Sequence, residues 1–352
     1  MKHSLLYERH EAAGAALRPR DESHPLLTYG EVPAEYEAAA SGAVLFDETD
    51  RGLLRITGGD AAEFLHRMTS NVINGLEPGQ GNRNLLLTGK GKILFDFDLA
   101  RTEEGYLVST LPGIAETLQQ KLDMFLFAED VQLEDQSDSS APLYLAGPQA
   151  GPLVSGLGAT LPTDDHAWTS FELEGKAVRV TRLDSYGPEG YRLDGGPELA
   201  EPLWNALIEA GARPAGRIVA DVLRVESCRA IWGQDVDETV YPQEARLEEA
   251  FDLSKGCYPG QEVVAKIDTY GGLNKRLFRL KVSHSDPVPR GARLCRHDAD
   301  KDEWRDLGVV TSWAYSFPED TGTVLAYVKR RHQEPGTVFR IDDGPAEATL
   351  LD

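Results

Sequence analysis

The chain has 352 residues and a formal net charge of −22, because 58 Asp and Glu residues outnumber 36 Lys and Arg residues. Its length predicts two or three folded domains. Hydrophobic residues make up 41% and charged residues 27%, which excludes a wholly disordered chain. The negative charge repels polyphosphates and anionic lipids, so we expect no direct nucleic-acid contact and no membrane partner.

The cysteine content indicates a reducing compartment, and the histidines bear on metal binding. The three cysteines, Cys228, Cys257 and Cys295, form no C-x-x-C pair, which favours reduced thiols over disulfides. The eight histidines are scattered, so we predict no metal site. The chain has no apolar run of about 18 residues and no signal-peptide pattern at its N-terminus. We therefore expect a cytoplasmic protein.

Strand and helix signals alternate in the first segment of the chain. A strand is predicted at 52–57, and Asp60 is expected to cap the helix that follows it. Two strands joined by a Gly-rich turn are predicted between 85 and 99. A second helix is predicted at 114–127.

A second α/β segment runs from about 143 to 211. Alternating apolar residues predict a half-buried strand at 176–183, and helical spacing predicts helices at 199–210 and 217–229. After Leu273, short strands separated by Pro and Gly turns replace the helical patterns, which indicates a small antiparallel barrel or sandwich. These short strands are predicted at 277–282, 307–311, 324–327 and 338–341.

The stretch from Lys255 to Glu262 has unusual chemistry. A lone Cys257 is flanked by Lys255, two glycines and a proline, which predicts a tight turn that exposes the thiol, and a nearby ammonium favours the reactive thiolate. Six bases against two acids between Lys255 and Lys281 also predict a local anion site or docking face. The alternative is that Cys257 is a small buried hydrophobe and that the bases line a solvated strand.

Motifs along most of the chain resemble one known family. The opening is similar to L-Y-x-x-H-x-x-x-G-A, and the Lys255–Glu262 stretch resembles K-G-C-Y-x-G-Q-E. These motifs resemble those of the YgfZ-type folate-binding proteins, relatives of the glycine cleavage T-protein (aminomethyltransferase) and of mitochondrial iron–sulfur assembly factors. The matching segments are 6–15, 45–47, 55–61, 223–226, 231–235, 242–245, 255–262 and 308–312.

The resemblance implies an α+β fold. Residues 1–274 are expected to form T-protein-like folate-binding α/β modules, divided at about 1–140 and 141–274. Residues 275–352 are expected to form a small C-terminal antiparallel β-barrel that closes the folate site. The implied cofactor is tetrahydrofolate or one of its one-carbon derivatives.

The resemblance also implies site residues. Asp96 falls where T-proteins keep an aspartate beside the reactive nitrogens of tetrahydrofolate, where a carboxylate can orient N–H groups or move a proton. The alternatives are that Asp96 is a structural residue at a strand end, or that Asp98 takes the role. Asp96, Cys257 and Lys255 form the predicted catalytic set.

The predicted folate-binding set contains Asp96 and four further residues. Arg224 is expected to pair with a folate tail carboxylate, although an i,i+3 pair with Asp221 is an alternative. The remaining members of the set are Tyr191, Tyr258 and Gln261.

Two positions depart from the T-protein pattern. The Gly190–Tyr191 dipeptide is followed by Arg192, where T-proteins have a glutamate that holds the pterin, and Asn84 stands where they often have an aromatic residue. T-proteins also generally lack the cysteine at the position of Cys257. These departures favour the YgfZ-like interpretation.

We therefore predict a tetrahydrofolate-binding accessory protein that supports the assembly or repair of iron–sulfur enzymes, with Cys257 essential. Its partners would be the folate and iron–sulfur client or assembly proteins. The alternative is an enzyme, aminomethyltransferase-like, that transfers a one-carbon unit to tetrahydrofolate. A third hypothesis is an interaction module without a working folate pocket.

Overall fold

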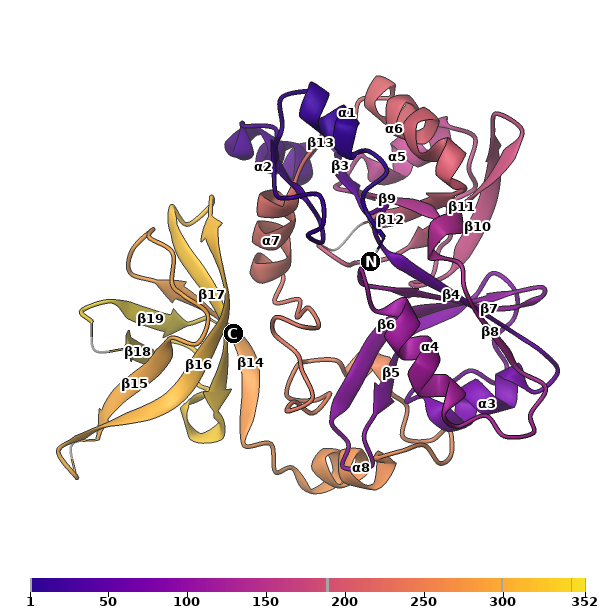
Figure 1. Cartoon of the computed structure of the whole chain (residues 1–352). Helices are drawn as coiled ribbons and strands as arrows, with labels where there is room; N and C mark the ends of the chain where they lie inside the picture. Colours follow the sequence, from indigo (N-terminus) through magenta and orange to yellow (C-terminus); the bar gives the residue numbers. More distant parts are fainter. Residues whose placement is uncertain (1, 188–189, 299, 343, 352) are drawn as a thin grey trace. The chain divides into compact units, whose positions relative to one another are not determined.

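The structure is a computed structural model, and it describes residues 2–187, 190–298, 300–342 and 344–351 (Figure 1). The chain divides into two compact units, which are described separately. The first unit contains Met1–Leu86, Phe95–Ala220 and Ala250–Tyr258, and the second contains Leu87–Leu94, Asp221–Glu249 and Pro259–Asp352. The second unit thus includes the predicted barrel region and segments that precede it in the chain. The domain boundary at residue 274 stays a prediction.

A five-stranded sheet forms one part of the first unit. Its strand order is β5-β6-β7-β4-β8. Helices α3 (Ala61–Met68) and α4 (Ala115–Asp123) pack on it through buried apolar residues such as Phe64 and Leu118. The strand bounds are Gly81–Leu87 for β5, Ile93–Thr102 for β6, Gly105–Thr110 for β7, Gly52–Thr57 for β4 and Gln132–Asp135 for β8.

The elements that the sequence predicts for this sheet are confirmed in part. The predicted strand at 52–57 and the predicted hairpin between 85 and 99 are confirmed. The helix predicted at 114–127 already ends at Asp123, where the chain tightens into 3-10-type turns. The capping prediction for Asp60 is wrong, because its carboxylate instead accepts the backbone N–H of Asp130 at 2.8 Å.

A six-stranded sheet forms the other part of the first unit, in the order β10-β11-β12-β9-β3-β13. Helices α5 (Ala150–Gly156) and α6 (Ala200–Glu209) cover one face of it (Figure 1). Their apolar side chains, among them Val154 and Leu203, share a core with β9, whose six residues are all buried. The strand bounds are Trp168–Leu173 for β10, Lys176–Arg182 for β11, Gly190–Gly195 for β12, Ala141–Ala146 for β9, Val44–Asp47 for β3 and Arg213–Pro214 for β13.

The N-terminal segment completes this sheet. Strand β3 pairs with β9 antiparallel, although nearly one hundred residues, including the whole five-stranded sheet, separate them. His10, on α1 (Tyr7–Ala12), places its Nε2 3.1 Å from the Asp47 carboxylate at the end of β3. Two of the motifs that carry the family resemblance therefore contact each other in the fold. The remaining N-terminal elements are β1 (Ala16–Leu17), β2 (Leu26–Thr28) and α2 (Val32–Ser41).

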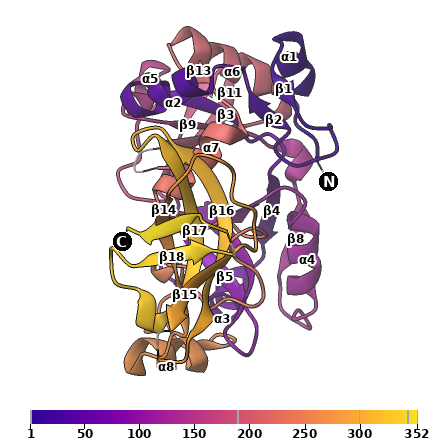
Figure 2. The ribbon, with the colours of Figure 1, turned by 90° about the vertical axis from the view of Figure 1, so that its left-hand side faces the viewer.

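The second unit contains a closed six-stranded barrel, so the predicted barrel is confirmed (Figure 2). Fully buried side chains such as Leu280, Val310 and Phe339 fill it. The sequence missed β15 and β19 and underestimated the length of β16, because their exposed polar residues hide the alternating pattern. In order around the barrel, the strands are β14 (Lys275–Val282), β17 (Thr321–Lys329), β16 (Glu303–Ser316), β15 (Arg293–Asp298), β18 (Val338–Ile341) and β19 (Glu347–Leu350).

Two further α-helices, α7 and α8, lie outside the segments described so far. The predicted helix at 217–229 is observed as α7 (Arg217–Glu226), and α8 (Gln261–Tyr270) was not predicted. Gly260, which precedes α8, has φ +79°, and a Cβ there would lie 2.6 Å from the Gly91 backbone. Glycine at this position therefore lets the loop after β5 pack closely against the start of α8.

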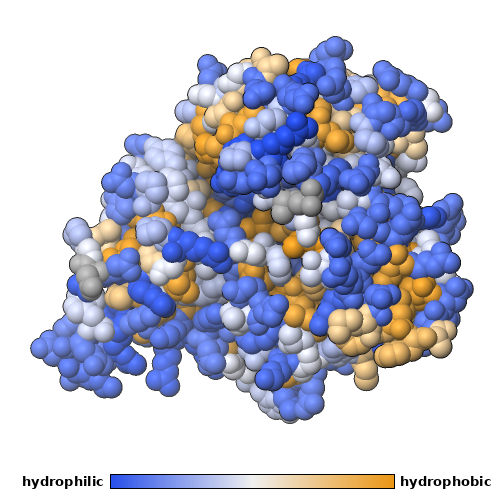
Figure 3. All heavy atoms as spheres, viewed as in Figure 1, coloured by the Kyte–Doolittle hydropathy of each residue, from blue (hydrophilic) through white to orange (hydrophobic). Residues whose placement is uncertain are grey.

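The surface is mostly hydrophilic, in agreement with the high content of charged residues. Figure 3 shows mostly hydrophilic side chains on the face it presents, with smaller hydrophobic patches between them. Among the residues that the structure describes, no helix combines the length and the apolar character needed to cross a bilayer.

Candidate functional site

Strand β6 presents two carboxylates on the same face. Burial alternates along the strand, with Phe95, Phe97 and Leu99 pointing into the core. Asp96 and Asp98 therefore both point to the opposite face. Their position on this face decides which cationic side chains each carboxylate contacts.

Asp96 is held by Arg83 on the neighbouring strand β5. The guanidinium makes two parallel hydrogen bonds, from Nε to Oδ1 at 2.8 Å and from Nη2 to Oδ2 at 2.5 Å. Such a bidentate pair fixes the plane of the carboxylate. A carboxylate offers about four lone-pair positions, so Asp96 keeps acceptor capacity for a ligand N–H.

Asp98 belongs to a separate buried network. Arg192 on β12 donates from Nη1 to Asp98 at 2.8 Å and from Nε to Glu48 at 2.9 Å. Glu48 also accepts the Tyr186 hydroxyl at 2.8 Å, and Arg51 lies 3.7 Å from Glu48 and 3.8 Å from Asp98. The Arg192 guanidinium therefore joins Asp98 on β6 of the five-stranded sheet to Glu48, the residue that follows β3 of the six-stranded sheet.

His166 extends this network. Its Nε2 lies 3.2 Å from Asp98 and its Nδ1 lies 3.0 Å from Asp165. Burial by itself lowers the pKa of His166, but the hydrogen bonds and charges of Asp165 and Asp98 outweigh it and raise that pKa to about 9. Burial raises the pKa of Asp98, yet Arg192 and His166 hold it well below its ordinary value. The network therefore contains ionised partners on both sides at neutral pH.

This geometry predicts a pH dependence of stability. Because the folded-state pKa of His166 is above the ordinary 6.5, its contribution is complete below about pH 6.5 and is lost as the pH rises through about 9. Relative to His166→Gln, the wild type should lose free energy of unfolding with a slope of at most about 1.4 kcal/mol per pH unit in that window. Urea unfolding of both proteins at several pH values measures this. Parallel pH curves for the two proteins would contradict it.

Tyr191 points away from this network. It neighbours Arg192 in β12, so its side chain lies on the opposite face of the sheet. There it packs partly buried against the apolar core, and its hydroxyl is close to Gly151 on α5. Its predicted folate contact stays a prediction, and the structure gives the side chain a packing role.

Asn84 is also committed to the structure of the first unit. It is fully buried, its Oδ1 accepts the Asn71 N–H at 2.7 Å, and its amide donates to Asn82 at 2.7 Å. Its neighbour Arg83 points the other way, towards Asp96. The aromatic side chain expected at position 84 from the T-protein pattern is thus replaced by a buried hydrogen-bonding residue.

Arg224 lies in the second unit and is 2% exposed. Its guanidinium donates to Asp221 at 2.6 Å, to Asp235 at 2.8 Å and to the Ser312 hydroxyl at 2.9 Å. The alternative i,i+3 pair with Asp221 is therefore formed. These protein partners already engage the guanidinium that was expected to bind a folate tail. The folate-binding role of Arg224 stays a prediction.

The motif around Cys257 crosses from one unit to the other. Lys255, Cys257 and Tyr258 belong to the first unit, whereas Gln261, the partly buried first residue of α8, belongs to the second. Cys257 is exposed, while Cys228 and Cys295 are partly buried. The prediction of a turn that exposes the thiol agrees with this, and the buried alternative for Cys257 does not.

Lys255 is positioned by α3. Its amine donates to the backbone carbonyl of His66, and the His66 Nε2 lies 2.8 Å from the carbonyl oxygen of Lys255. The amine also faces the ring of Tyr258, 5.2 Å from its centroid. Burial lowers the pKa of Lys255 to about 8, only partly opposed by Asp252. The structure thus brings Lys255 and Tyr258 together, and activation of Cys257 by Lys255 stays a prediction.

The predicted basic patch is largely neutralised by ion pairs. Within the second unit, Lys266 contacts Glu262 at 2.6 Å and Arg276 contacts Glu248 at 2.9 Å. Lys281 lies 3.3 Å from Glu319. The excess of bases in this part of the sequence therefore does not translate into a free cation cluster.

Sequence reasoning missed Arg83, Glu48 and His166. Glu48 and Asp98 are 144 and 94 positions from Arg192, so no local pattern could have linked them. The available signal was the alternating pattern of β6, which places Asp96 and Asp98 on one face of the sheet. Two carboxylates on one face indicate that cationic side chains lie near them.

Comparisons with known proteins agree with this fold. The family model of the GCVT N-terminal domain matches residues 6–255. An aminomethyltransferase of Chlorobium luteolum is 30% identical over 96% of this chain and 93% of its own length. One of Saccharopolyspora erythraea is 29% identical over 97% and 94%, respectively. The crystal structure of the glycine cleavage system aminomethyltransferase T from Bartonella henselae has a TM-score of 0.85 at 25% identity, covering 99% of this chain and 95% of that one.

Proposed function

Since the chain belongs to the family of the GCVT N-terminal domain, we propose that it binds tetrahydrofolate or a one-carbon derivative and takes part in one-carbon transfer. Relatives called aminomethyltransferase match it over nearly their whole length, which supports an activity of that type. Bound tetrahydrofolate would supply the nitrogens that carry the one-carbon unit.

The fixed orientation of the Asp96 carboxylate is the observation that carries this proposal. Its carboxylate is oriented by two hydrogen bonds from Arg83 and keeps spare acceptor capacity. Such a group can accept an N–H of a reduced folate and hold the adjacent nitrogen in one orientation. The side chain is therefore suited to position the ligand.

Arg192 limits which pterin contacts are available. Its two carboxylate partners, Glu48 and Asp98, use its donors, and it cannot act as an acceptor for pterin N–H groups. A transferase of this type would have to satisfy those N–H groups elsewhere, because an unpaired buried donor costs about 1–3 kcal/mol. We infer that folate binds more weakly here than in a protein with a glutamate at this position.

Two measurements on the wild-type protein test the proposal. Anaerobic calorimetric titration with tetrahydrofolate should give saturable binding. Protein supplied with tetrahydrofolate and an aminomethylated lipoyl carrier should then release ammonia above background. Binding without ammonia release would remove the transferase part, and absence of binding would remove the proposal as a whole.

A second candidate function is support of iron–sulfur enzyme assembly or repair, together with folate. The exposed free thiol of Cys257 favours it, because an accessible thiol can lend one ligand transiently or exchange with a client thiol. One cysteine cannot hold a four-thiolate cluster, so a client or assembly protein would supply the other ligands.

Cys257→Ala should abolish rescue of an iron–sulfur enzyme's activity in a deletion strain. Its affinity for tetrahydrofolate should equal that of the wild type, because the exposed side chain supports neither the sheet nor Asp96. Cys295→Ala, which removes a partly buried barrel thiol, is the control and should still rescue. Rescue by Cys257→Ala would show that the thiol has no part in this activity.

A further inference from the structure

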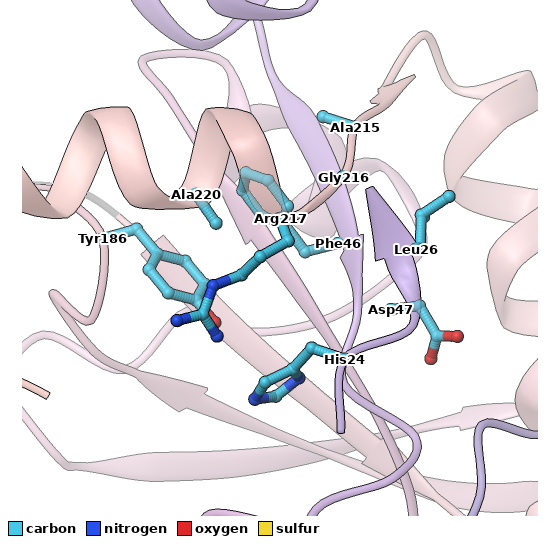
Figure 4. A pocket seen from close by; sticks show the side chains of 9 residues that line it. All are labelled: His24, Leu26, Phe46, Asp47, Tyr186, Ala215, Gly216, Arg217 and Ala220. Atoms are coloured by element: carbon cyan, nitrogen blue, oxygen red, sulfur yellow. The ribbon is translucent and has the colours of Figure 1, made fainter. Parts of the chain in front are cut away.

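The cavity shown in Figure 4 is too small to hold a ligand. Its walls include Leu26, Phe46 and Tyr186, and its volume of about 20 Å³ admits a single water molecule. The feature of the first unit that points to a further partner lies on its surface instead.

The loop that follows α4 exposes three large apolar side chains within four consecutive residues. Met124 is 66% exposed, Phe125 is 39% exposed and Phe127 is 88% exposed. Figure 3 shows hydrophobic side chains at the surface in the region of α3 and α4. A single exposed apolar side chain is ordinary in a folded protein, whereas a group of them indicates an interaction surface. The other large apolar side chains recorded as exposed come singly from separate parts of the chain: Leu5, Ile218, Tyr270, Trp304 and Val338.

Hydrogen bonds hold this apolar loop, residues 124–127, in one shape. The Oε2 of Glu129 accepts the backbone N–H of Phe127 at 2.9 Å and that of Ala128 at 3.1 Å. Its Oε1 accepts a hydrogen bond from Nη2 of Arg67 on α3 at 2.6 Å. Because the loop is already ordered, binding through Phe127 costs little conformational entropy.

Four carboxylates without a cationic partner surround the apolar loop. Asp123 directly precedes it, and the backbone N–H of Asp130, just beyond it, donates to the Asp60 carboxylate at 2.8 Å. Glu63 lies one turn before Arg67 on the same face of α3. Arg67 is paired with Glu129, and no Lys or Arg among the described residues forms an ion pair with any of the four carboxylates.

The charge around the apolar loop favours one kind of partner. Residues 114–138 contain seven acids and the single base Lys121. A second copy of this chain carries a net charge of −22 and would bring the same acids against this surface, so self-association here is unfavourable. A partner that matches the surface combines apolar side chains with Lys or Arg, as a basic amphipathic helix does.

We propose that the apolar loop and the four carboxylates around it form a docking surface for a basic amphipathic helix of a partner protein. Phe127 and Met124 contact the apolar face of that helix, and Met124 adapts its shape to the side chains it meets. The carboxylates of Asp123 and its three neighbours face the Lys and Arg residues of the helix. The surface contains none of the residues predicted to bind folate, so the proposal does not depend on the proposed function.

The probe is a fluorescein-labelled amphipathic peptide of leucine and lysine, titrated with the full chain and followed by fluorescence anisotropy. It should bind saturably, and the same peptide with glutamate in place of lysine should not bind. Phe127→Ser should lower the affinity roughly 10- to 100-fold, the usual effect of removing an aromatic anchor. Tyr270→Ser, which removes an aromatic side chain of similar exposure (84%) from α8, is the control and should leave the affinity unchanged.

The double variant Asp123→Asn, Glu63→Gln should also weaken binding of the lysine peptide and should reduce its dependence on salt. No saturation, equal binding of the glutamate peptide, or unchanged affinity in Phe127→Ser would overturn the proposal. Dimerisation of the wild type that Phe127→Ser abolishes, measured by sedimentation, would also overturn it, in favour of a second copy of this chain. Since Phe127 is mostly exposed, Phe127→Ser should unfold at the same urea concentration as the wild type. If it does not, Met124→Ser replaces it in the same titration.

Discussion

Replacing Arg192 by methionine should lower the free energy of unfolding by about 3–5 kcal/mol, the usual cost of leaving buried charges without their partner. Arg192 is 5% exposed and Glu48 is 1% exposed, so water cannot replace the guanidinium. Methionine matches the unbranched stem of arginine as far as Nε and removes the rest of the guanidinium with its charge and donors. The loss therefore reports mainly on the two carboxylates left without their donors.

Urea unfolding at pH 7 measures this effect. Lys176→Met is the control, because Lys176 and Glu198 form an exposed pair that should contribute about 1 kcal/mol or less. Adding Glu48→Gln to Arg192→Met should recover part of the loss, since it removes one uncompensated charge. A loss as small as that of the control would mean that Glu48 and Asp98 find other partners, such as Arg51.

Asp96→Asn should weaken tetrahydrofolate binding by roughly 10- to 100-fold, because it replaces a charged acceptor at the ligand by a neutral one. The substitution preserves the size of the side chain, but the NH2 of asparagine cannot accept a hydrogen bond from Arg83 as the second carboxylate oxygen does. Calorimetric titration measures the affinity, and urea unfolding of the same sample measures any loss of stability separately.

Two further variants show whether the effect belongs to Asp96. Glu172→Gln removes an exposed carboxylate on β10 and should change neither affinity nor stability. Asp98→Asn should mainly destabilise the protein, because Asp98 is bound by Arg192 and His166. If Asp98→Asn weakens folate binding while Asp96→Asn does not, the role belongs to Asp98, the alternative that the sequence left open.

Local patterns predicted much of the architecture. The strand at 52–57, the hairpin between 85 and 99 and four of the six barrel strands follow from short-range periodicity and turn residues, and the structure confirms them. The end of the helix at Asp123 and the helix α8 were not predicted. At the start of α8 the close contact of Gly260 with Gly91 joins segments far apart in the chain, which a local pattern does not record.

The motifs in the chain were sufficient to identify the superfamily, because each is a contiguous run whose residue types and order can be read directly. They also singled out Asp96 and the exposed Cys257. Tertiary structure alone decided the partners of these residues. Arg83 reaches Asp96 only because β5 and β6 lie side by side. Arg192 joins Glu48 to Asp98 only because β3 pairs with β9, a strand far from it in the sequence. Such contacts join residues that are far apart in the sequence, and their energies depend on burial, which no local pattern records.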